Sequence, residues 1–122
     1  MALILVVEDE APIRELLVVL LRAHGHRTDT AGNGAQALTR IEAERPDLVL
    51  TDLMMPVMGG VELCRRLKGD PATAAIPVIL TSAVDARHAA GAGADAFVAK
   101  PFELDQVEAT IDHWLTAGRL TT

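Results

Sequence analysis

Carboxylate side chains follow two apolar segments of this chain. Glu8 and Asp9 come directly after the apolar run 3–7, and Asp52 comes after the run 48–51. Unbroken Val, Ile and Leu runs are typical of parallel strands buried on both faces, and open sheets of this kind bind ligands beyond the carboxyl ends of their strands. We therefore expect the three acids to meet in one crevice. Because unit charges about 4 Å apart repel by roughly 4 kcal/mol at an effective dielectric constant near 20, the sequence predicts a divalent, oxygen-preferring cation such as Mg²⁺ there.

Two later segments bring further polar groups to the same predicted edge. The segment 77–82 ends with the hydroxyls of Thr81 and Ser82, and the segment 97–101 carries Lys100, one of two lysines in the chain. An ammonium group and a hydroxyl donor can both bind oxygens of a group attached to Asp52. The combination points to phosphoryl chemistry at Asp52.

In this order, the motifs resemble the receiver domain of two-component response regulators, over essentially the whole chain. An acidic pair, an Asp that opens an Asp-Leu-Met-Met-Pro segment, a hydroxyl-Ala pair and a Lys-Pro-Phe end follow one another as in that family: Glu8-Asp9, Asp52–Pro56, Ser82-Ala83 and Lys100-Pro101-Phe102. The resemblance implies an α/β fold, doubly wound, with a five-stranded parallel sheet in the flavodoxin-like order 2-1-3-4-5. One domain is expected over residues 1–122.

The resemblance also implies a role for each acid. Asp52 would accept a phosphoryl group from a sensor histidine kinase or a histidine phosphotransfer protein. Mg²⁺, or Mn²⁺ in its place, would be bound by Asp9, Asp52 and the main-chain carbonyl of Met54, while Glu8 would support the metal through water. Such a domain catalyses only its own phosphorylation and dephosphorylation, so it is not expected to be an enzyme. It passes the signal to a downstream protein or an attached effector domain.

Two residues are expected to sense the phosphoryl group. Ser82 lies 30 positions after Asp52, as the family pattern requires, and it would act together with Lys100. Neighbouring side chains of a strand face opposite ways, so Thr81 should point toward the packed interior instead.

Four more residues receive expectations from the resemblance. Phe97 would be the aromatic switch that turns inward on phosphorylation, and the peptide bond before Pro101 would be cis, which only X-Pro bonds tolerate at little cost. Met54 and Val84 each lie two positions beyond a site residue and are both apolar. Because polar groups there help to orient an attacking water, this pair predicts slow self-dephosphorylation.

The segment between the sensing residues is short for this family. Ser82 and Lys100 are 18 positions apart, about four fewer than in many relatives, which is roughly one helical turn. We expect a shortened or irregular fourth helix over residues 84–92, a segment of mostly Ala with little to pack. Partners of this family read the surface formed by that helix, the fifth strand and the last helix, so we expect this surface to be altered. We expect phosphorylation to act by ordering residues 84–92.

Strands and helices should alternate along the rest of the chain. We expect a first helix from Pro12, a second opened by the capping box Asn33 and Gln36, a third opened by residues 59–60, and a last helix from about residue 104. The strand within residues 26–31 has few strong strand formers and should lie at an edge. An inward stripe is expected on the first helix: Ile13, Leu16, Leu17, Leu20 and Leu21.

Composition argues against several classes of protein. A net charge of −6 argues against direct nucleic-acid binding, which requires clustered Lys and Arg. No apolar stretch is long enough to span a bilayer and no signal peptide is evident, so a cytoplasmic protein without membrane contact is expected. The single Cys64 cannot form an internal disulfide and should be a small core residue. His24 and His26 lack a nearby carboxylate or thiol at typical zinc spacing, so a zinc site at these two residues is disfavoured.

Two alternative functions remain in view. A phosphatase of the haloacid-dehalogenase type also forms an aspartyl phosphate with Mg²⁺, but it carries a second Asp two positions after the nucleophile, where this chain has Met54. A degenerate receiver that binds partners without phosphate is disfavoured because every site position holds a competent residue. The cognate kinase and the output cannot be read from the sequence.

Overall fold

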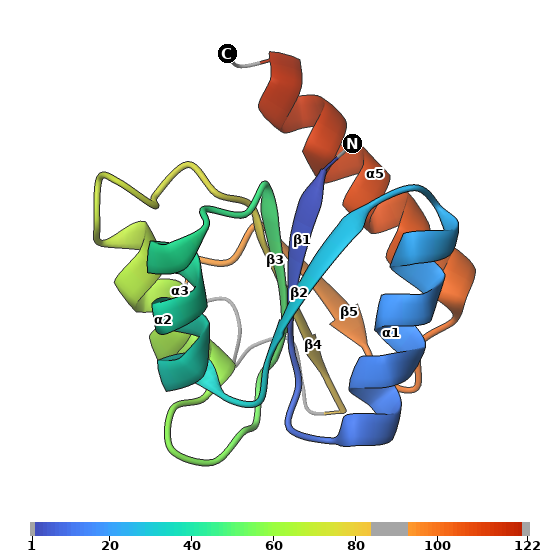
Figure 1. Cartoon of the computed structure of the whole chain (residues 1–122), viewed down its shortest axis with the longest axis horizontal. Coiled ribbons are helices and arrows are strands. Elements are labelled where there is room, and N and C mark those ends of the chain that lie inside the picture. Colours follow the sequence, from blue (N-terminus) through green and yellow to red (C-terminus); the bar gives the residue numbers. More distant parts are fainter. Residues whose placement is uncertain (1, 84–92, 121–122) are drawn as a thin grey trace.

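The computed structural model describes residues 2–83 and 93–120, with side chains as far as residue 116. Its five parallel strands form one sheet (Figure 1): β1 (Leu3–Val7), β2 (Arg27–Ala31), β3 (Leu48–Asp52), β4 (Val78–Ser82) and β5 (Ala96–Ala99). The strand order is β2-β1-β3-β4-β5, as predicted, and β2 lies at an edge.

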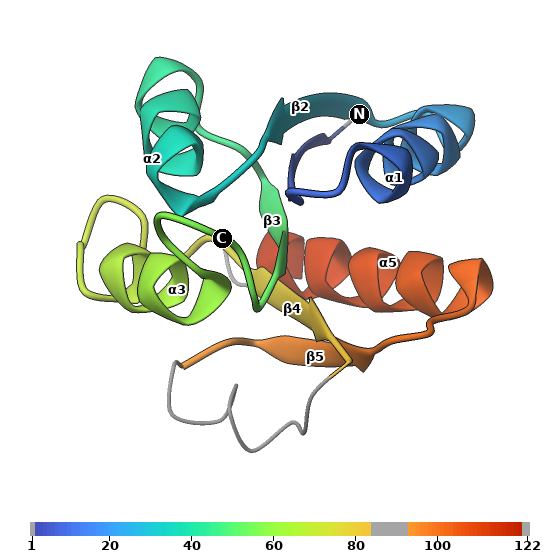
Figure 2. The same cartoon turned by 90° about the horizontal axis from the view of Figure 1, so that it is seen from below.

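Four helices cover the sheet in the described part of the chain: α1 (Ala11–Ala23), α2 (Gly34–Ala43), α3 (Gly60–Lys68) and α5 (Leu104–Leu120). Helices α1 and α5 lie on one face of the sheet and α2 and α3 on the other (Figure 2). The shortened fourth helix expected over residues 84–92 lies outside the described residues. None of the helices in residues 2–83 and 93–120 is both long and apolar enough to cross a membrane.

An apolar cluster is buried on each face of the sheet. Alternate strand residues contribute to the two sides, with Ile4 and Leu50 toward α1 and α5, and Leu5 and Val49 toward α2 and α3. The helices add their own buried side chains: Leu17, Leu21, Val107 and Ile111 on the first side, and Ala37, Ile41, Leu63, Cys64 and Leu67 on the second. Burial on both faces explains why β1 and β3 read as unbroken apolar runs.

One position of α1 departs from the expected inward stripe. Leu16 is 48% exposed, whereas Leu17 and Leu21 are buried and Ile13 and Val18 pack against the core. Residues 13, 17 and 21 lie one turn apart on the same face of the helix. The sheet therefore covers a narrower stripe than the sequence suggests, and the prediction for Leu16 was wrong.

Local signals account for the starts of α2 and α3. Asn33 Oδ1 accepts a hydrogen bond from the Gln36 amide at 2.9 Å, and Gln36 Oε1 accepts one from the Gly32 amide at 2.9 Å. Helix α3 begins at Gly60, where a Cβ atom would collide with the main-chain oxygen of Asp52. The glycine thus allows α3 to pack directly against the end of β3.

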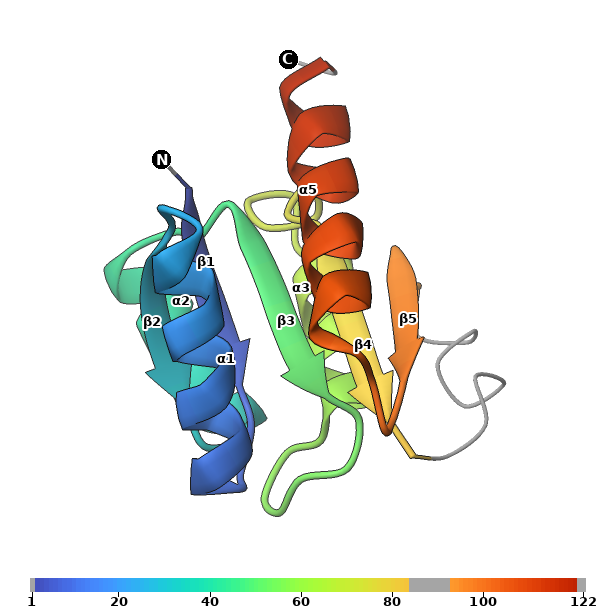
Figure 3. The same cartoon turned by 90° about the vertical axis from the view of Figure 1, so that its right-hand side faces the viewer.

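The carboxyl ends of four strands are in step. Residues pair across them as follows: Val7 with Thr51, Asp52 with Thr81, and Ser82 with Ala99. All five strands run to the same end of the molecule (Figure 3). This register places Glu8, Asp52 and Lys100, which lie at or just beyond strand ends, at one edge of the sheet.

Candidate functional site

Three carboxylates form a cluster beyond β1 and β3. Oxygen atoms of Glu8, Asp9 and Asp52 all lie within 4.8 Å of one another. Glu8 is 2% exposed and Asp52 is 8% exposed, whereas Asp9 is open to solvent. The predicted convergence is therefore present, with one accessible acid at the mouth of the site and two buried behind it.

Lys100 reaches into this cluster from the end of β5. Its ammonium Nζ lies 3.2 Å from Glu8 Oε1 and 3.4 Å from Asp52 Oδ1. Burial opposes the charged form of the ammonium, but the Asp52 and Glu8 carboxylates outweigh burial and raise the pKa of Lys100. Lys100 is therefore a fixed positive charge between two buried acids.

Glu8 titrates close to neutral pH. Burial is the main cause, followed by repulsion from Asp52, and together they raise the pKa of Glu8 to about 7 even though Lys100 opposes the shift. Near neutral pH the site thus exchanges a proton at Glu8. A divalent cation beside Glu8 would favour the ionised form and promote release of that proton.

The carboxylate of Asp52 is oriented by the main chain as well as by Lys100. Asp52 Oδ1 accepts a hydrogen bond from the Leu53 amide at 2.9 Å. The Leu53 amide also lies 2.9 Å from the main-chain oxygen of Thr81, which ties the end of β3 to β4. Asp52 therefore presents its side chain from a well-held strand end.

Two buried hydroxyls lie at the end of β4. Thr81 is 3% exposed and pairs with Asp52, and Ser82 is 2% exposed and follows one residue nearer the carboxyl edge. The main-chain oxygen of Ser82 accepts a hydrogen bond from the Lys100 amide at 2.8 Å, which joins the ends of β4 and β5. A group attached to Asp52 would project beyond the strand end, where Ser82 lies, and this favours Ser82 over Thr81 as its hydrogen-bond donor. The choice between the two hydroxyls stays a prediction.

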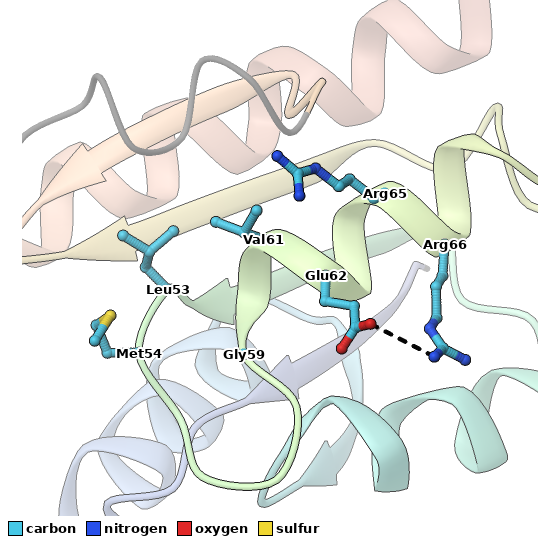
Figure 4. A pocket seen from close by; sticks show the side chains of 7 residues that line it. All are labelled: Leu53, Met54, Gly59, Val61, Glu62, Arg65 and Arg66. Atoms are coloured by element: carbon cyan, nitrogen blue, oxygen red, sulfur yellow. Dashed lines mark ion pairs between the residues drawn. The ribbon is translucent and has the colours of Figure 1, made fainter.

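A pocket of about 660 Å³ opens beside the connection from β3 to α3 (Figure 4). Seven residues line it: Leu53, Met54 and Gly59 from the connection, and Val61, Glu62, Arg65 and Arg66 from α3. The Met54 side chain is 65% exposed at this pocket, and Glu62 and Arg66 form an ion pair of 3.5 Å on its α3 side. Because the Met54 side chain is exposed, replacing it should leave the core intact. The expected contact between the Met54 main-chain carbonyl and the metal stays a prediction.

The remaining predicted site residues fall on β5 and its neighbours. Phe97 is partly buried, packs against the core on the α2 and α3 side, and pairs with Leu80. The Lys100–Pro101 peptide bond is cis, as predicted. Val84 lies outside the described residues, so its expected role in dephosphorylation is a prediction only.

The sequence reading missed Arg14, which lies on α1 beside the acids. Its Nη1 atom donates a hydrogen bond to the main-chain oxygen of Glu8 at 2.7 Å. A cation near a helix N-terminus opposes the helix dipole, so a basic residue at this place has to be explained by another interaction. That mismatch is the signal by which the sequence could have revealed Arg14.

The donor set fits a hard divalent cation. The carboxylates of the cluster offer only oxygen ligands, which Mg²⁺ and Mn²⁺ prefer, and no Cys or His belongs to the cluster in the described residues. With all groups ionised, three carboxylates and one ammonium leave an excess of negative charge at the site. A divalent cation would balance that excess.

Comparison with known proteins bears on this geometry. Residues 4–112 match the family described as the response regulator receiver domain. The chain is 40% identical over 112 residues to the DNA-binding response regulator MtrA of Mycobacterium tuberculosis, covering 88% of this chain and 48% of MtrA. It is 43% identical over 103 residues to the phosphate regulon transcriptional regulatory protein PhoB of Pseudomonas aeruginosa, covering 81% of this chain and 45% of PhoB. The chain thus spans about half the length of the curated relatives it matches.

Solved structures share the fold over nearly the whole chain. The signal receiver domain of a signal transduction histidine kinase from Syntrophus aciditrophicus matches with a TM-score of 0.92 and 34% identity, covering 96% of this chain and 92% of that one. The chemotaxis protein CheY4 of Vibrio cholerae matches with a TM-score of 0.86 and 26% identity, covering 93% of this chain and 98% of that one. The family match spans every site residue between Glu8 and Pro101.

Proposed function

The chain belongs to the response regulator receiver domain family, and we propose that it is a phosphorylation switch whose phosphoacceptor is Asp52. The donor would be a sensor histidine kinase or a histidine phosphotransfer protein. One observation carries the assignment to Asp52: this carboxylate is buried, lies 3.4 Å from the Lys100 ammonium, and belongs to a cluster of three acids. Asp52 alone of these acids is held by both Lys100 and a main-chain amide.

The proposed transfer moves the phosphoryl group from a histidine nitrogen to Asp52. A carboxylate oxygen of Asp52 attacks the phosphorus, and the bond from phosphorus to the donor's nitrogen breaks. The electron pair of that bond stays on the histidine nitrogen, which takes up a proton. The Leu53 amide orients Asp52 for the attack, and Lys100 stabilises negative charge on the phosphoryl oxygens.

We assign the metal ligands to Asp9, Asp52 and the Met54 carbonyl, with Glu8 acting through water. Mg²⁺, when bound, supplies positive charge for the phosphoryl oxygens. Because Asp9 is the exposed member of the cluster, it is the acid that an incoming cation meets first. Deprotonation of Glu8, whose pKa lies at about 7, would accompany binding.

Ser82 and Lys100 would report the phosphoryl group to the rest of the domain. The hydrogen bond between the Lys100 amide and the Ser82 carbonyl supports this, because movement of one residue displaces the ends of both β4 and β5. Phe97 pairs with Leu80, two residues before Ser82, and it is only partly buried, so an inward turn would bury more of its ring. The surface that partners read would comprise the fourth-helix segment, β5 and α5.

The switch is proposed to act without a small-molecule substrate of its own. Met54 occupies the position where a haloacid-dehalogenase-type phosphatase carries its acid, so an attacking water would lack help and the phosphoform would be long-lived. Val84 would contribute to the same effect. Met54→Asn should shorten the half-life of the phosphoform, and an unchanged half-life would count against this part of the proposal.

Output is proposed to pass to a downstream protein or an attached effector domain. The relatives MtrA and PhoB are described as a DNA-binding and a transcriptional regulator, and the present chain matches about half of each. A net charge of −6 disfavours contact between this domain and nucleic acid.

Phosphorylation by a small phosphodonor tests the proposal. Wild type, Asp52→Asn and the control Asp112→Asn, which alters an exposed acid of α5, are incubated with acetyl phosphate and Mg²⁺, and the phosphoform is measured by intact mass. Wild type and the control should be modified equally, and Asp52→Asn should not. Equal modification of wild type and Asp52→Asn would refute the phosphoacceptor. Modification that continues unchanged in excess EDTA would refute the role of the metal.

A further inference from the structure

The connection from β1 to α1 carries two acids of the proposed metal site and is held from both ends by Arg14. The Arg14 guanidinium donates through Nη1 to the main-chain oxygen of Glu8 at 2.7 Å, and the Arg14 amide donates to the main-chain oxygen of Glu10 at 3.0 Å. The Glu8 carbonyl belongs to the Glu8–Asp9 peptide group, and the Glu10 carbonyl belongs to the Glu10–Ala11 peptide group at the start of α1. The Arg14 side chain therefore fixes the peptide group just before Asp9, and the Arg14 amide makes the first helical hydrogen bond just after the acidic pair.

Little else restrains Asp9. Its side chain is exposed and makes no hydrogen bond or ion pair with the residues that the structure describes. Helix α1 also begins without a capping side chain, because Glu10 makes no side-chain hydrogen bond to the first turn. The position of the Asp9 carboxylate thus depends on the backbone of residues 8–10, and Arg14 is what holds that backbone on its helix side.

We propose that Arg14 is a positioning residue for the metal site, holding the Glu8–Asp9 peptide group so that both carboxylates face the position of the cation. The inference rests on the proposed function, because it presumes that these acids bind Mg²⁺. Groups that orient metal ligands without touching the metal commonly change affinity by 10- to 100-fold when removed. Arg14 acts on a main-chain carbonyl, so we expect an effect at the lower end, about tenfold.

The charge of Arg14 would act in the opposite direction. A guanidinium bound to the main chain of Glu8 would repel a cation held by the neighbouring acids, so if Arg14 mattered only as a charge, its removal would tighten Mg²⁺ binding. If Arg14 positions the acids, its removal weakens binding despite the lost repulsion. The sign of the change therefore separates the two roles.

Magnesium titration by calorimetry supplies the test. Arg14→Met keeps the apolar stem and removes both donor and charge, Arg14→Lys keeps charge and one donor group, and Arg22→Met is the matched control. Arg22 is exposed two turns further along α1 and bonds Thr28 instead of the acidic loop. We expect the Mg²⁺ dissociation constant to rise about tenfold in Arg14→Met, to stay near wild type in Arg14→Lys, and to be unchanged in Arg22→Met.

Unfolding in EDTA checks that each variant is folded without metal. If Arg14→Met does not fold, Arg14→Gln is judged by the same criterion, because its shorter side chain also loses the reach to Glu8. If the neutral Arg14 variant binds Mg²⁺ as tightly as wild type, or more tightly, the positioning role of Arg14 is overturned. Absence of Mg²⁺ binding by wild type would instead overturn the proposed metal site, so the two failures are distinguishable.

Discussion

Glu8 should make the folded protein less stable as the pH rises. Burial, then repulsion from Asp52, raises its pKa from an ordinary 4.5 to about 7. In the unfolded chain the carboxyl ionises at the ordinary value, so between these two values the native state keeps a proton that the unfolded state has lost. The stability that this proton contributes is fully present below pH 4.5 and is lost as the pH rises through about 7. A rise of about 2.5 in pKa corresponds to roughly 3 kcal/mol.

Glu8→Gln cannot ionise and should escape this loss. Between pH 5.5 and pH 8 the free energy of unfolding of wild type should fall relative to Glu8→Gln by about 2 kcal/mol, since only the part of the titration above pH 5.5 is sampled. Urea unfolding in EDTA at the two pH values measures the difference, and Glu10→Gln, an exposed neighbour, is the control. Adding Mg²⁺ at pH 8 should stabilise wild type more than Glu8→Gln. A difference between wild type and Glu8→Gln that is the same at both pH values would refute the reasoning.

Three further outcomes are expected. Lys100→Met removes the positive charge between two acids, so the pKa of Glu8 should rise above about 7, as measured by NMR titration of the carboxyl group. An unchanged pKa of Glu8 would contradict the ion pair between Lys100 and Glu8. The Lys68 ammonium donates hydrogen bonds to two main-chain oxygens and, at 2.8 Å, to the Asp95 carboxylate. Lys68→Met should therefore lower the free energy of unfolding, measured in urea, by about 2 to 3 kcal/mol. A loss below about 0.5 kcal/mol would show that these hydrogen bonds contribute little to stability. Val57 has a φ of 68° and is 84% exposed, so Val57→Asn should raise the free energy of unfolding by about 1 kcal/mol without loss of burial, whereas Val57→Ala should gain less.

Short stretches of sequence predict most of the strands and helices, and they also predict the positions of Asp52 and Lys100 in the site. Apolar runs bounded by acids identify β1 and β3, because burial on both faces removes the polar alternation of a half-exposed strand. The capping residue Asn33 and the glycine pair 59–60 mark where α2 and α3 begin, since helix starts depend on a few neighbouring backbone groups. Because strand ends carry the site, the positions of Asp52 and Lys100 could be predicted with the strands.

Tertiary structure decided which of these groups meet and how deeply each is buried. The contact between Lys100 and Glu8 joins residues 92 positions apart, and it exists only because the strand register brings the ends of β1, β3, β4 and β5 into step. Burial raises the pKa of Glu8, and burial depends on everything packed around the site. Leu16 is exposed because the sheet covers a narrower stripe of α1, and Arg14 reaches the Glu8 carbonyl because α1 folds back beside the strand end. Periodicity and capping are local properties that a sequence window contains, whereas contacts across the sheet, exposure and electrostatics arise only when distant segments pack together.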